Sequence, residues 1–260
     1  MIGCIIQARM GSSRLPGKAM KKLHDKTPML KFQLEQLKFS KYIDKIIIAT
    51  TTLENDNFIV NFCEQNNLEY FRGSSKDVLD RYYNCAKKFE FPIIVRITSD
   101  NPLIDPEIID NVINEFVTSK CDYMTTEYPK TYPLGFAVEI LNFKSLEKAW
   151  NEAVLPSERE HVTPYLIKNK TLFKHKNYSY YQNISHLRCT VDTDEDFKLI
   201  EKIIQKIDAR PIHLIDVVNL SKSEPRLFEL NNHIKHDGYE KSLKEDKEFL
   251  KNNTGYEKNN

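Results

Sequence analysis

The amino-acid sequence predicts an α/β fold in which helices cover both faces of a mixed, mostly parallel sheet. Short apolar runs rich in β-branched residues alternate with longer stretches whose apolar residues recur at helical spacing, and polar turns separate the two. The runs predicted as strands are residues 2–8, 44–51, 68–71 and 91–98. Because this alternation is typical of parallel pairing, the carboxyl ends of the strands should meet at one edge of the sheet, where ligands bind.

Capping residues and proline mark the expected starts of the intervening helices. Asn55 or Asp56 can cap one helix and Asp77 another, because their side chains accept hydrogen bonds from free N–H groups of a first turn. Pro106 stands where a first turn tolerates proline, with Asp105 before it as the cap. The apolar positions that these helices should bury include Phe58, Ile59, Phe62, Cys63, Val78, Leu79, Tyr82, Ala86, Phe89, Ile108, Ile109, Val112, Ile113 and Phe116.

The second half of the chain is less regular. Residues 136–141 and 187–191 are predicted strands, and helices are expected near residues 145–153, from about Ser157, and after Asp194. From about residue 221 the chain becomes strongly charged, so we expect a core domain over residues 1–220 and a helical C-terminal extension over residues 221–260. Its apolar stripe should pack on the core or on a second copy in a homodimer, and consists of Leu227, Leu230, Ile234, Leu243 and Leu250.

Composition excludes several classes of partner. The chain has 38 Lys and Arg residues against 37 Asp and Glu residues, so no global basic field favours nucleic acid or a membrane surface. No run approaches the roughly 20 apolar residues of a membrane-spanning helix. The five scattered cysteines form no CxxC pair and no secretory segment precedes them, which favours reduced thiols and a cytoplasmic location.

A basic, glycine-containing loop follows the first predicted strand. The stretch QARMGSSRLPGK, residues 7–18, combines Arg9, Arg14 and Lys18 with Gly11 and Gly17. Such a loop can curl around an anion, because its glycines allow backbone N–H groups to approach closely and its cations neutralise charge. A triphosphate is therefore the expected ligand. It matches neither GxxxxGK[ST] nor GxGxxG, and the alternative is a solvated basic turn.

Two carboxylates should face this loop from the same edge of the sheet. Asp100 follows strand 91–98 and Asp192 follows strand 187–191. Carboxylates close to phosphates are favourable only with a divalent cation between them, and Mg²⁺ needs only one or two carboxylates besides phosphate oxygens and water. Asp194 is better placed as the cap of the following helix.

The motifs IIQARMGSSRLPGK, FRGSSKDVLDRYY, RITSDNPLIDP, PSEREHVTPYL and VDTDED occur in this order, and with them the chain resembles the SpsF-like cytidylyltransferases, relatives of the CMP-KDO and CMP-sialic-acid synthetases. The resemblance runs from Ile2 to about Leu250 and implies a GT-A-like nucleotidyltransferase fold. It also implies that the enzyme transfers CMP from CTP to a sugar or sugar acid with release of pyrophosphate, making an activated nucleotide sugar for surface polysaccharide or glycan synthesis.

The resemblance also implies roles for individual residues. Mg²⁺ would be held by Asp100 and Asp192, and Arg14, Lys18 and Asp100 would act in catalysis. The sugar would face residues 156–166. Within this segment Ser157 is expected to cap a helix, and Glu160 is expected to complete its capping box by accepting from the Ser157 N–H. The implied nucleotide contacts are Ala8, Arg9, Ser12, Arg14 and Lys18, with Arg72 and Gly73 near the base or ribose, and the implied substrate contacts are Glu158, Arg159 and His161.

Some alternatives stay open from the sequence. Where relatives carry two acidic residues, this chain has Leu134 and Ala137, so its acceptor specificity can differ from theirs. A GT-A glycosyltransferase would also place a nucleotide beside a metal held by Asp, although SDN here has one carboxylate of the usual DxD. A non-catalytic nucleotide-binding module is the third possibility, and the acceptor itself is not identified.

Overall fold

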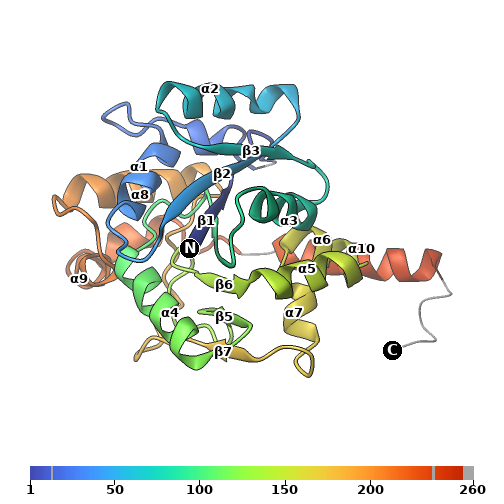
Figure 1. Ribbon diagram of the computed structural model, residues 1–260. Coiled ribbons are helices and arrows are strands. Elements are labelled where there is room, and N and C mark those ends of the chain that lie inside the picture. The colour runs from blue at the N-terminus through green and yellow to red at the C-terminus, as the bar shows by residue number, and fades with distance from the viewer. Residues whose placement is uncertain (13, 236–237, 254–260) are drawn as a thin grey trace.

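The computed structural model describes residues 1–12, 14–235 and 238–253 and shows one seven-stranded sheet with helices on both faces (Figure 1). The strand order is β3-β2-β1-β4-β6-β5-β7. The parallel part comprises β1 (Ile2–Gln7), β2 (Lys45–Thr51), β3 (Tyr70–Gly73) and β4 (Ile93–Thr98). Beyond it, β6 (Glu139–Asn142) runs antiparallel to β4 and to β5 (Tyr123–Thr125), while β7 (His175–Asn177) pairs in parallel with β5. The predicted fold class is confirmed.

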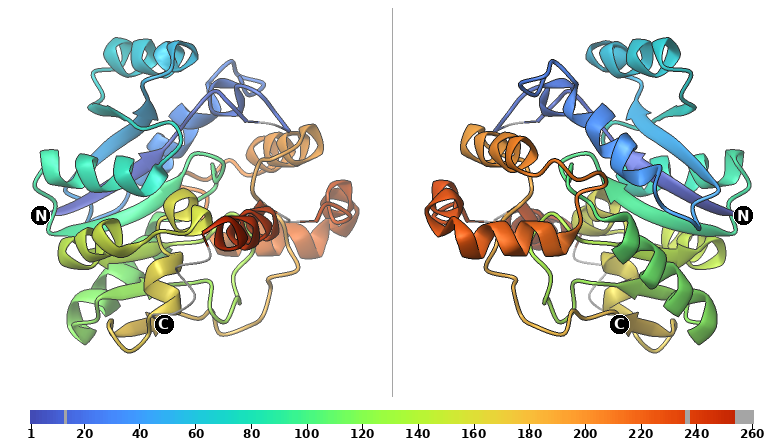
Figure 2. Two further views of the ribbon diagram at one scale, coloured as in Figure 1. Left: turned by 90° about the vertical axis from the view of Figure 1, so that its right-hand side faces the viewer. Right: turned by 90° about the vertical axis from the view of Figure 1, so that its left-hand side faces the viewer.

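The strands alternate their side chains between two apolar cores, one on each face of the sheet. In β1, Cys4 and Ile6 enter one core, whereas Ile5 enters the other. The first core is closed by α1 (Met29–Leu37), α2 (Asn57–Gln65), α4 (Pro106–Ser119), α8 (Asp194–Lys206) and α9 (Leu214–Ser223). The second is closed by α3 (Val78–Lys88), α5 (Phe143–Glu152) and α7 (Pro164–Lys168), and Figure 2 shows the two layers from both sides.

Two of the predicted helix caps are confirmed, whereas Asp56, just before α2, makes no side-chain cap hydrogen bond. The Asp77 side chain accepts a hydrogen bond from the Asp80 N–H, and Asp105 caps α4 with Pro106 in its first turn. The start of α8 is one residue earlier than expected, because Thr193 is its cap and Asp194 instead pairs with Lys21. In α2, Ile59, Phe62 and Cys63 are buried as predicted, but Phe58 is 66% exposed.

Other expectations need correction. Residues 187–191 form no strand. Their only strand-like pairing among the described residues is an isolated bridge between Arg188 and Leu134, next to Gly135 with its positive φ of 111°. The strand expected at 136–141 is β6, starting at Glu139. The short strands β5 and β7 and the helices α1 and α9 were not predicted.

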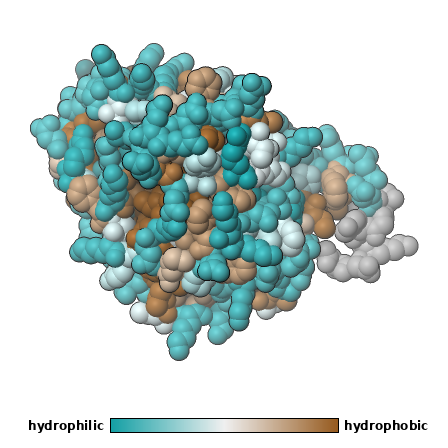
Figure 3. All heavy atoms as spheres, turned by 45° about the horizontal axis from the view of Figure 1, so that its top comes forward, coloured by the Kyte–Doolittle hydropathy of each residue, from teal (hydrophilic) through white to brown (hydrophobic). Residues whose placement is uncertain are grey.

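The C-terminal part is closely joined to the core. Position 221 lies inside α9, and the following 3-10 helix η3 (Pro225–Leu230) buries Leu227 and Phe228 in the first core. Helix α10 (Gly238–Asn252) extends from the body and packs beside α6 (Pro156–His161). In the described part of the chain, no helix has the length and apolar character needed to cross a bilayer. All five cysteines are buried and free, and the face shown in Figure 3 is mostly hydrophilic.

Candidate active site

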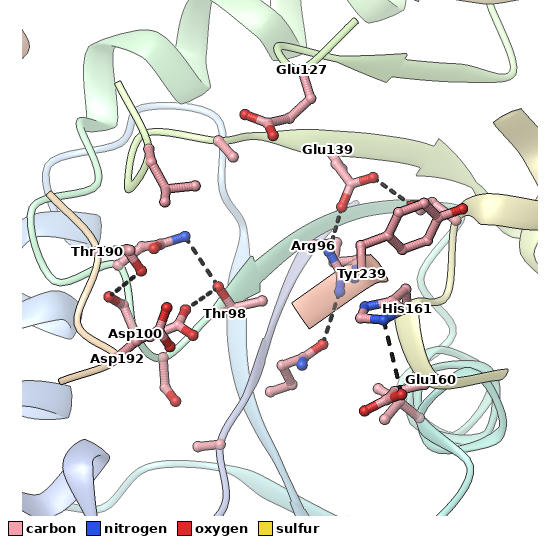
Figure 4. A pocket seen from close by; sticks show the side chains of 18 of the residues that line it. Arg96, Thr98, Asp100, Glu127, Glu139, Glu160, His161, Thr190, Asp192 and Tyr239 are labelled. Atoms are coloured by element: carbon pink, nitrogen blue, oxygen red, sulfur yellow. Dashed lines mark hydrogen bonds and ion pairs between the residues drawn. The ribbon is translucent and has the colours of Figure 1, made fainter. Parts of the chain in front are cut away.

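A polar cavity of about 420 Å³ opens at the carboxyl ends of β1 and β4. The loop after β1, the segment after β4, the start of β6, α6, α7 and one residue of α10 form its wall. Figure 4 shows Asp100 and Asp192 on one side and Glu160, His161 and Tyr239 on the other. The residues predicted from the sequence that line this cavity are Ala8, Arg9, Ser12, Arg14, Lys18, Asp100, His161 and Asp192.

Lys18 joins the two carboxylates that were expected to face the basic loop. Its ammonium donates hydrogen bonds to Asp100 Oδ2 at 3.0 Å, Asp192 Oδ1 at 2.9 Å and the Val191 carbonyl at 2.8 Å. Burial alone would lower the pKa of Lys18, but the charges of Asp100 and Asp192 outweigh it and raise that pKa. Burial would likewise raise the pKa of Asp100, yet Lys18 and the Thr98 hydroxyl hold it below its usual value. Lys18 and Asp100 are therefore both ionised across the physiological pH range.

The loop that carries Lys18 is held by its backbone. The Gly17 N–H donates to the Met10 carbonyl at 2.8 Å, and the Met10 N–H donates to the Asp56 carboxylate at 2.6 Å. Gly17 has a φ of 72°, a conformation that glycine adopts without steric cost, and it leads directly into the 3-10 turn η1 (Lys18–Met20). Arg14, on the same loop, is partly exposed and lies 3.1 Å from Asp192 Oδ2. The loop thus presents two cations to one carboxylate.

Asp192 is positioned from behind by a buried ionic network. Asp196, which is fully buried, accepts hydrogen bonds from Arg188 Nε and NH2, both at 2.8 Å, and from the Asp192 N–H at 2.9 Å. Arg188 in turn lies 3.1 Å from Asp192 Oδ2, and the Asn231 amide donates to Asp196 at 2.8 Å. The network fixes a segment that has no regular strand pairing. It ties the Asp192 carboxylate to the start of α8.

A second buried ion pair stands between the two sides of the cavity (Figure 4). Arg96 in β4 pairs with Glu139 in β6, and the Tyr123 and Thr163 hydroxyls donate to the same carboxylate at 2.5 and 2.6 Å. Burial would lower the pKa of Arg96, but Glu139 outweighs it and raises that pKa. Sequence reasoning missed this pair, although a lone arginine inside the apolar run IIVRIT was a visible signal, since buried charges need partners.

The side of the cavity opposite Asp192 is built from α6 and α10. The His161 ring meets the Tyr239 ring edge-on, with centroids 5.3 Å apart, and its Nε2 lies 2.9 Å from the Ser242 hydroxyl. Ser242 donates to Glu160 at 2.8 Å. Further along α10, the buried Asp246 accepts from the Ser157 N–H at 2.8 Å and from its hydroxyl at 2.6 Å. The extension therefore completes the cavity wall.

Four residues expected at the substrate lie outside the cavity lining, and their contacts are structural. Arg72, in β3, donates to the carbonyls of Thr51 and Leu53, both at 2.9 Å, and to Asn57 Oδ1 at 2.8 Å, and thereby ties β3 to the end of β2 and the start of α2. The neighbouring Gly73 packs on Phe71 and Arg81. Arg159 pairs with Asp77 and donates to the Trp150 carbonyl at 2.7 Å.

Glu158 accepts hydrogen bonds from the N–H groups of Val154 and Leu155, both at 3.2 Å. Glu158 thus occupies the helix-capping position that was expected for Glu160, because α6 begins at Pro156 rather than after a capping Ser157. Glu158 consequently occupies the third position of the first turn, where it satisfies free N–H groups. Glu160 is left to line the cavity.

A basic loop after β1 and two converging carboxylates, one just after β4 and one after the irregular segment 187–191, are typical of a nucleotidyltransferase when they meet at one edge of a mostly parallel α/β sheet. The profile of the cytidylyltransferase family matches residues 3–233, so the chain belongs to this family, whose reaction is the transfer of CMP from CTP.

Individual relatives agree with this assignment. An uncharacterised protein of Methanocaldococcus jannaschii is 40% identical over 90% of this chain and 96% of its own length. The spore coat polysaccharide biosynthesis protein SpsF of Bacillus subtilis is 32% identical over 85% of this chain and 94% of its own. The solved structure of a cytidylyltransferase from Leptospira borgpetersenii has a TM-score of 0.85 at 35% identity and covers 90% of this chain and 99% of its own. The resemblance to the SpsF-like family is confirmed.

Proposed function

We propose that the protein transfers CMP from CTP to a hydroxyl or phosphate oxygen of a sugar or sugar acid, with Mg²⁺ as cofactor. The observation that carries this proposal is that Asp100 and Asp192 both contact the ammonium group of Lys18, a residue of the basic loop. Family membership favours cytidylyl transfer over glycosyl transfer and over a non-catalytic binding module.

The basic loop supplies the triphosphate site of the proposal. Ala8, Arg9, Ser12, Arg14 and Lys18 line one continuous part of the cavity, with exposed or half-exposed guanidinium groups on Arg9 and Arg14. As the acceptor oxygen attacks the α-phosphorus, the bond from that phosphorus to the bridging oxygen breaks. Pyrophosphate leaves with the electron pair, and a hydroxyl acceptor releases its proton. Arg14 and Lys18 would stabilise the negative charge that builds on pyrophosphate.

The oxygen atoms that meet between the end of β4 and the segment 187–192 fit Mg²⁺. Asp100 Oδ2, Asp192 Oδ1 and the Val191 carbonyl already surround one cation, Lys18 Nζ, at 2.8–3.0 Å. Hard oxygen donors of this kind are the ligands that Mg²⁺ prefers. The described residues contain no set of three or more His, Cys, Asp or Glu side chains arranged for a metal, but Mg²⁺ takes phosphate oxygens and water as further ligands. When bound, Mg²⁺ would neutralise part of the phosphate charge and so reduce its repulsion of the attacking oxygen.

The sugar acceptor would bind at the cavity wall formed by Glu160, His161 and Tyr239. An aromatic ring and two polar groups face the cavity across from the carboxylate pair (Figure 4), a combination suited to a sugar ring and its hydroxyls. Leu134 and Ala137 also line the cavity, so the two replaced acidic positions do border the site. By analogy with the Bacillus subtilis relative, the product would be a cytoplasmic precursor for surface polysaccharide.

A screen for pyrophosphate release tests the proposed function. Purified protein with Mg²⁺ and CTP, ATP, GTP or UTP would be offered 3-deoxy-manno-octulosonate, other 2-keto sugar acids, neutral sugars and sugar 1-phosphates. We expect release with CTP and one acceptor class, and a CMP-sugar of matching mass. Release without any acceptor-dependent product, or equal rates with all four nucleotides, would contradict the proposal.

A further inference from the structure

The ammonium group of Lys18 lies where the two aspartates would hold a metal ion. It has three N–H donors, and they meet three oxygens: those of Asp100, Asp192 and the Val191 main chain. Asp100 and Asp192 reach this point from segments 92 residues apart (192 − 100). In this arrangement all three N–H donors of Lys18 are engaged with protein oxygens. Lys18 must release at least one of these oxygens in order to donate to a leaving group.

Among the side chains in direct contact here, cations and carboxylates are equal in number. Lys18 and Arg14 together offset Asp100 and Asp192, while Arg188 is matched by the buried Asp196. Asp192 is in contact with three cations, since both Arg14 and Arg188 lie 3.1 Å from its Oδ2. A free divalent ion would have to displace Lys18 from a partly buried position and would leave that ammonium without partners, which is costly at low local dielectric.

A nucleotide changes this balance. The triphosphate of CTP brings several negative charges to the loop that carries both Arg14 and Lys18, so each cation gains a new anionic partner. Arg14 is partly exposed and can turn toward phosphate with little reorganisation. Once Lys18 turns as well, the three oxygens it leaves are free to bind a metal ion that arrives with the nucleotide.

We propose that Lys18 fills the metal position in the nucleotide-free enzyme, so that the divalent ion enters only together with CTP, as Lys18 moves from the aspartates to the phosphates. This inference rests on the proposed metal site and adds an order of binding to it. Lys18 then has two partners in one cycle. It neutralises Asp100 and Asp192 in the absence of nucleotide, and it stabilises pyrophosphate when CTP and the metal ion are bound.

Binding of Mn²⁺, followed by electron paramagnetic resonance and by water-proton relaxation, tests the inference without any sugar acceptor. In the absence of nucleotide, the wild-type protein should bind Mn²⁺ weakly, and Lys18→Met should bind it at least tenfold more tightly. The double variant Lys18→Met, Asp100→Asn should lose this gain. Lys21→Met is the matched control, because Lys21 also pairs with an aspartate, Asp194, just beyond the loop, and should behave as the wild type.

The outcomes separate the inference from the proposed function. Equal Mn²⁺ affinity in nucleotide-free wild type and Lys18→Met would overturn the inference, as would tight binding by both. If CTP induces an enzyme-bound Mn²⁺ signal in the wild type but Lys18→Met alone does not bind the ion, the metal site stands and Lys18 is not its occupant. No bound Mn²⁺ in any form, with or without CTP, would contradict the metal site itself. Lys18→Gln and thermal melting guard against loss of the fold.

Discussion

At the scale of single residues, Lys18 and Arg14 should serve the transition state more than the ground state. If they stabilise departing pyrophosphate, their interaction grows as charge develops, so Lys18→Met should lower kcat more than it raises the KM for CTP. Arg14→Lys should also be costly, because a point charge does not replace a forked guanidinium contact. Steady-state kinetics checks both, with Lys22→Met as a nearly silent control. Equal small effects at all three positions would mean that the loop is a solvated basic turn.

Asp196 is the residue on which the position of Asp192 depends. Burial would raise its pKa, but hydrogen bonds from Arg188 and Asn231 outweigh burial and lower it. The stability that Asp196 contributes is therefore present above its ordinary pKa of 3.8 and is lost as the pH falls through the lower folded value. Asp196→Asn should cost about 3–5 kcal/mol, because Arg188 is left buried without its partner.

Urea unfolding at pH 7 and in acid measures this effect. The variant should be less stable than the wild type at neutral pH, and the difference should shrink as the acid range is entered. Asp194→Asn, whose carboxylate is largely exposed and pairs with Lys21, is the matched control and should change little. A difference between Asp196→Asn and wild type that stays constant down to the lowest pH would contradict the account.

At the scale of elements, α10 should govern the acceptor rather than the nucleotide. Tyr239 lines the cavity, and Ser242 and Asp246 fasten the helix to α6, on the side away from the carboxylate pair. Truncation after Lys235 should raise the KM for the acceptor about tenfold or more and leave the KM for CTP nearly unchanged, since only the acceptor loses contacts. Truncation after Asn253 keeps α10 and should behave as the full chain. A matched rise in both KM values would show that α10 supports the whole fold instead.

At Gly135 the chain passes close to the backbone of the segment that leads to Asp192. A Cβ at this position would lie 2.5 Å from the Cys189 carbonyl group, and its φ of 111° is unfavourable for other residues. Gly135→Ala should therefore destabilise the protein by several kcal/mol, with strain and close contact adding together. Thermal melting measures it against Gly11→Ala, where an added Cβ meets nothing within 4 Å. Equal melting temperatures would contradict the importance of this approach.

At the scale of the whole molecule, the strands of the parallel half and most helices were predictable, whereas α1, α9 and the shortest strands were not. Apolar spacing and caps such as Asp77 and Asp105 locate a helix from the local sequence. The three-residue strands β5 and β7 carry too little pattern to detect, because their place is decided by pairing partners far along the chain.

The candidate site also has a part that the sequence predicts and a part that it does not. The loop cations and the two carboxylates follow from the motifs, although the strand expected before Asp192 is absent. Tyr239, in contrast, depends on a helix fastened by buried polar side chains in a charged stretch. The expected apolar stripe did not reveal this contact, since Ser242 and Asp246, not Leu243 or Leu250, are buried there. The roles of Glu158 and Glu160 depended on a helix start that lies two residues from the predicted one. The homodimer stays a prediction, and light scattering would show a mass twice that of the chain.

The central claim is that Asp100 and Asp192 hold the metal ion that activates CTP, and one measurement tests it most directly. With the acceptor found in the screen and saturating Mg²⁺, pyrophosphate release would be compared for wild type, Asp100→Asn and Asp192→Asn, after circular dichroism confirms their fold. Loss of a metal ligand should lower kcat by roughly a thousandfold or more in either variant. Near-normal turnover in either folded variant would contradict the account.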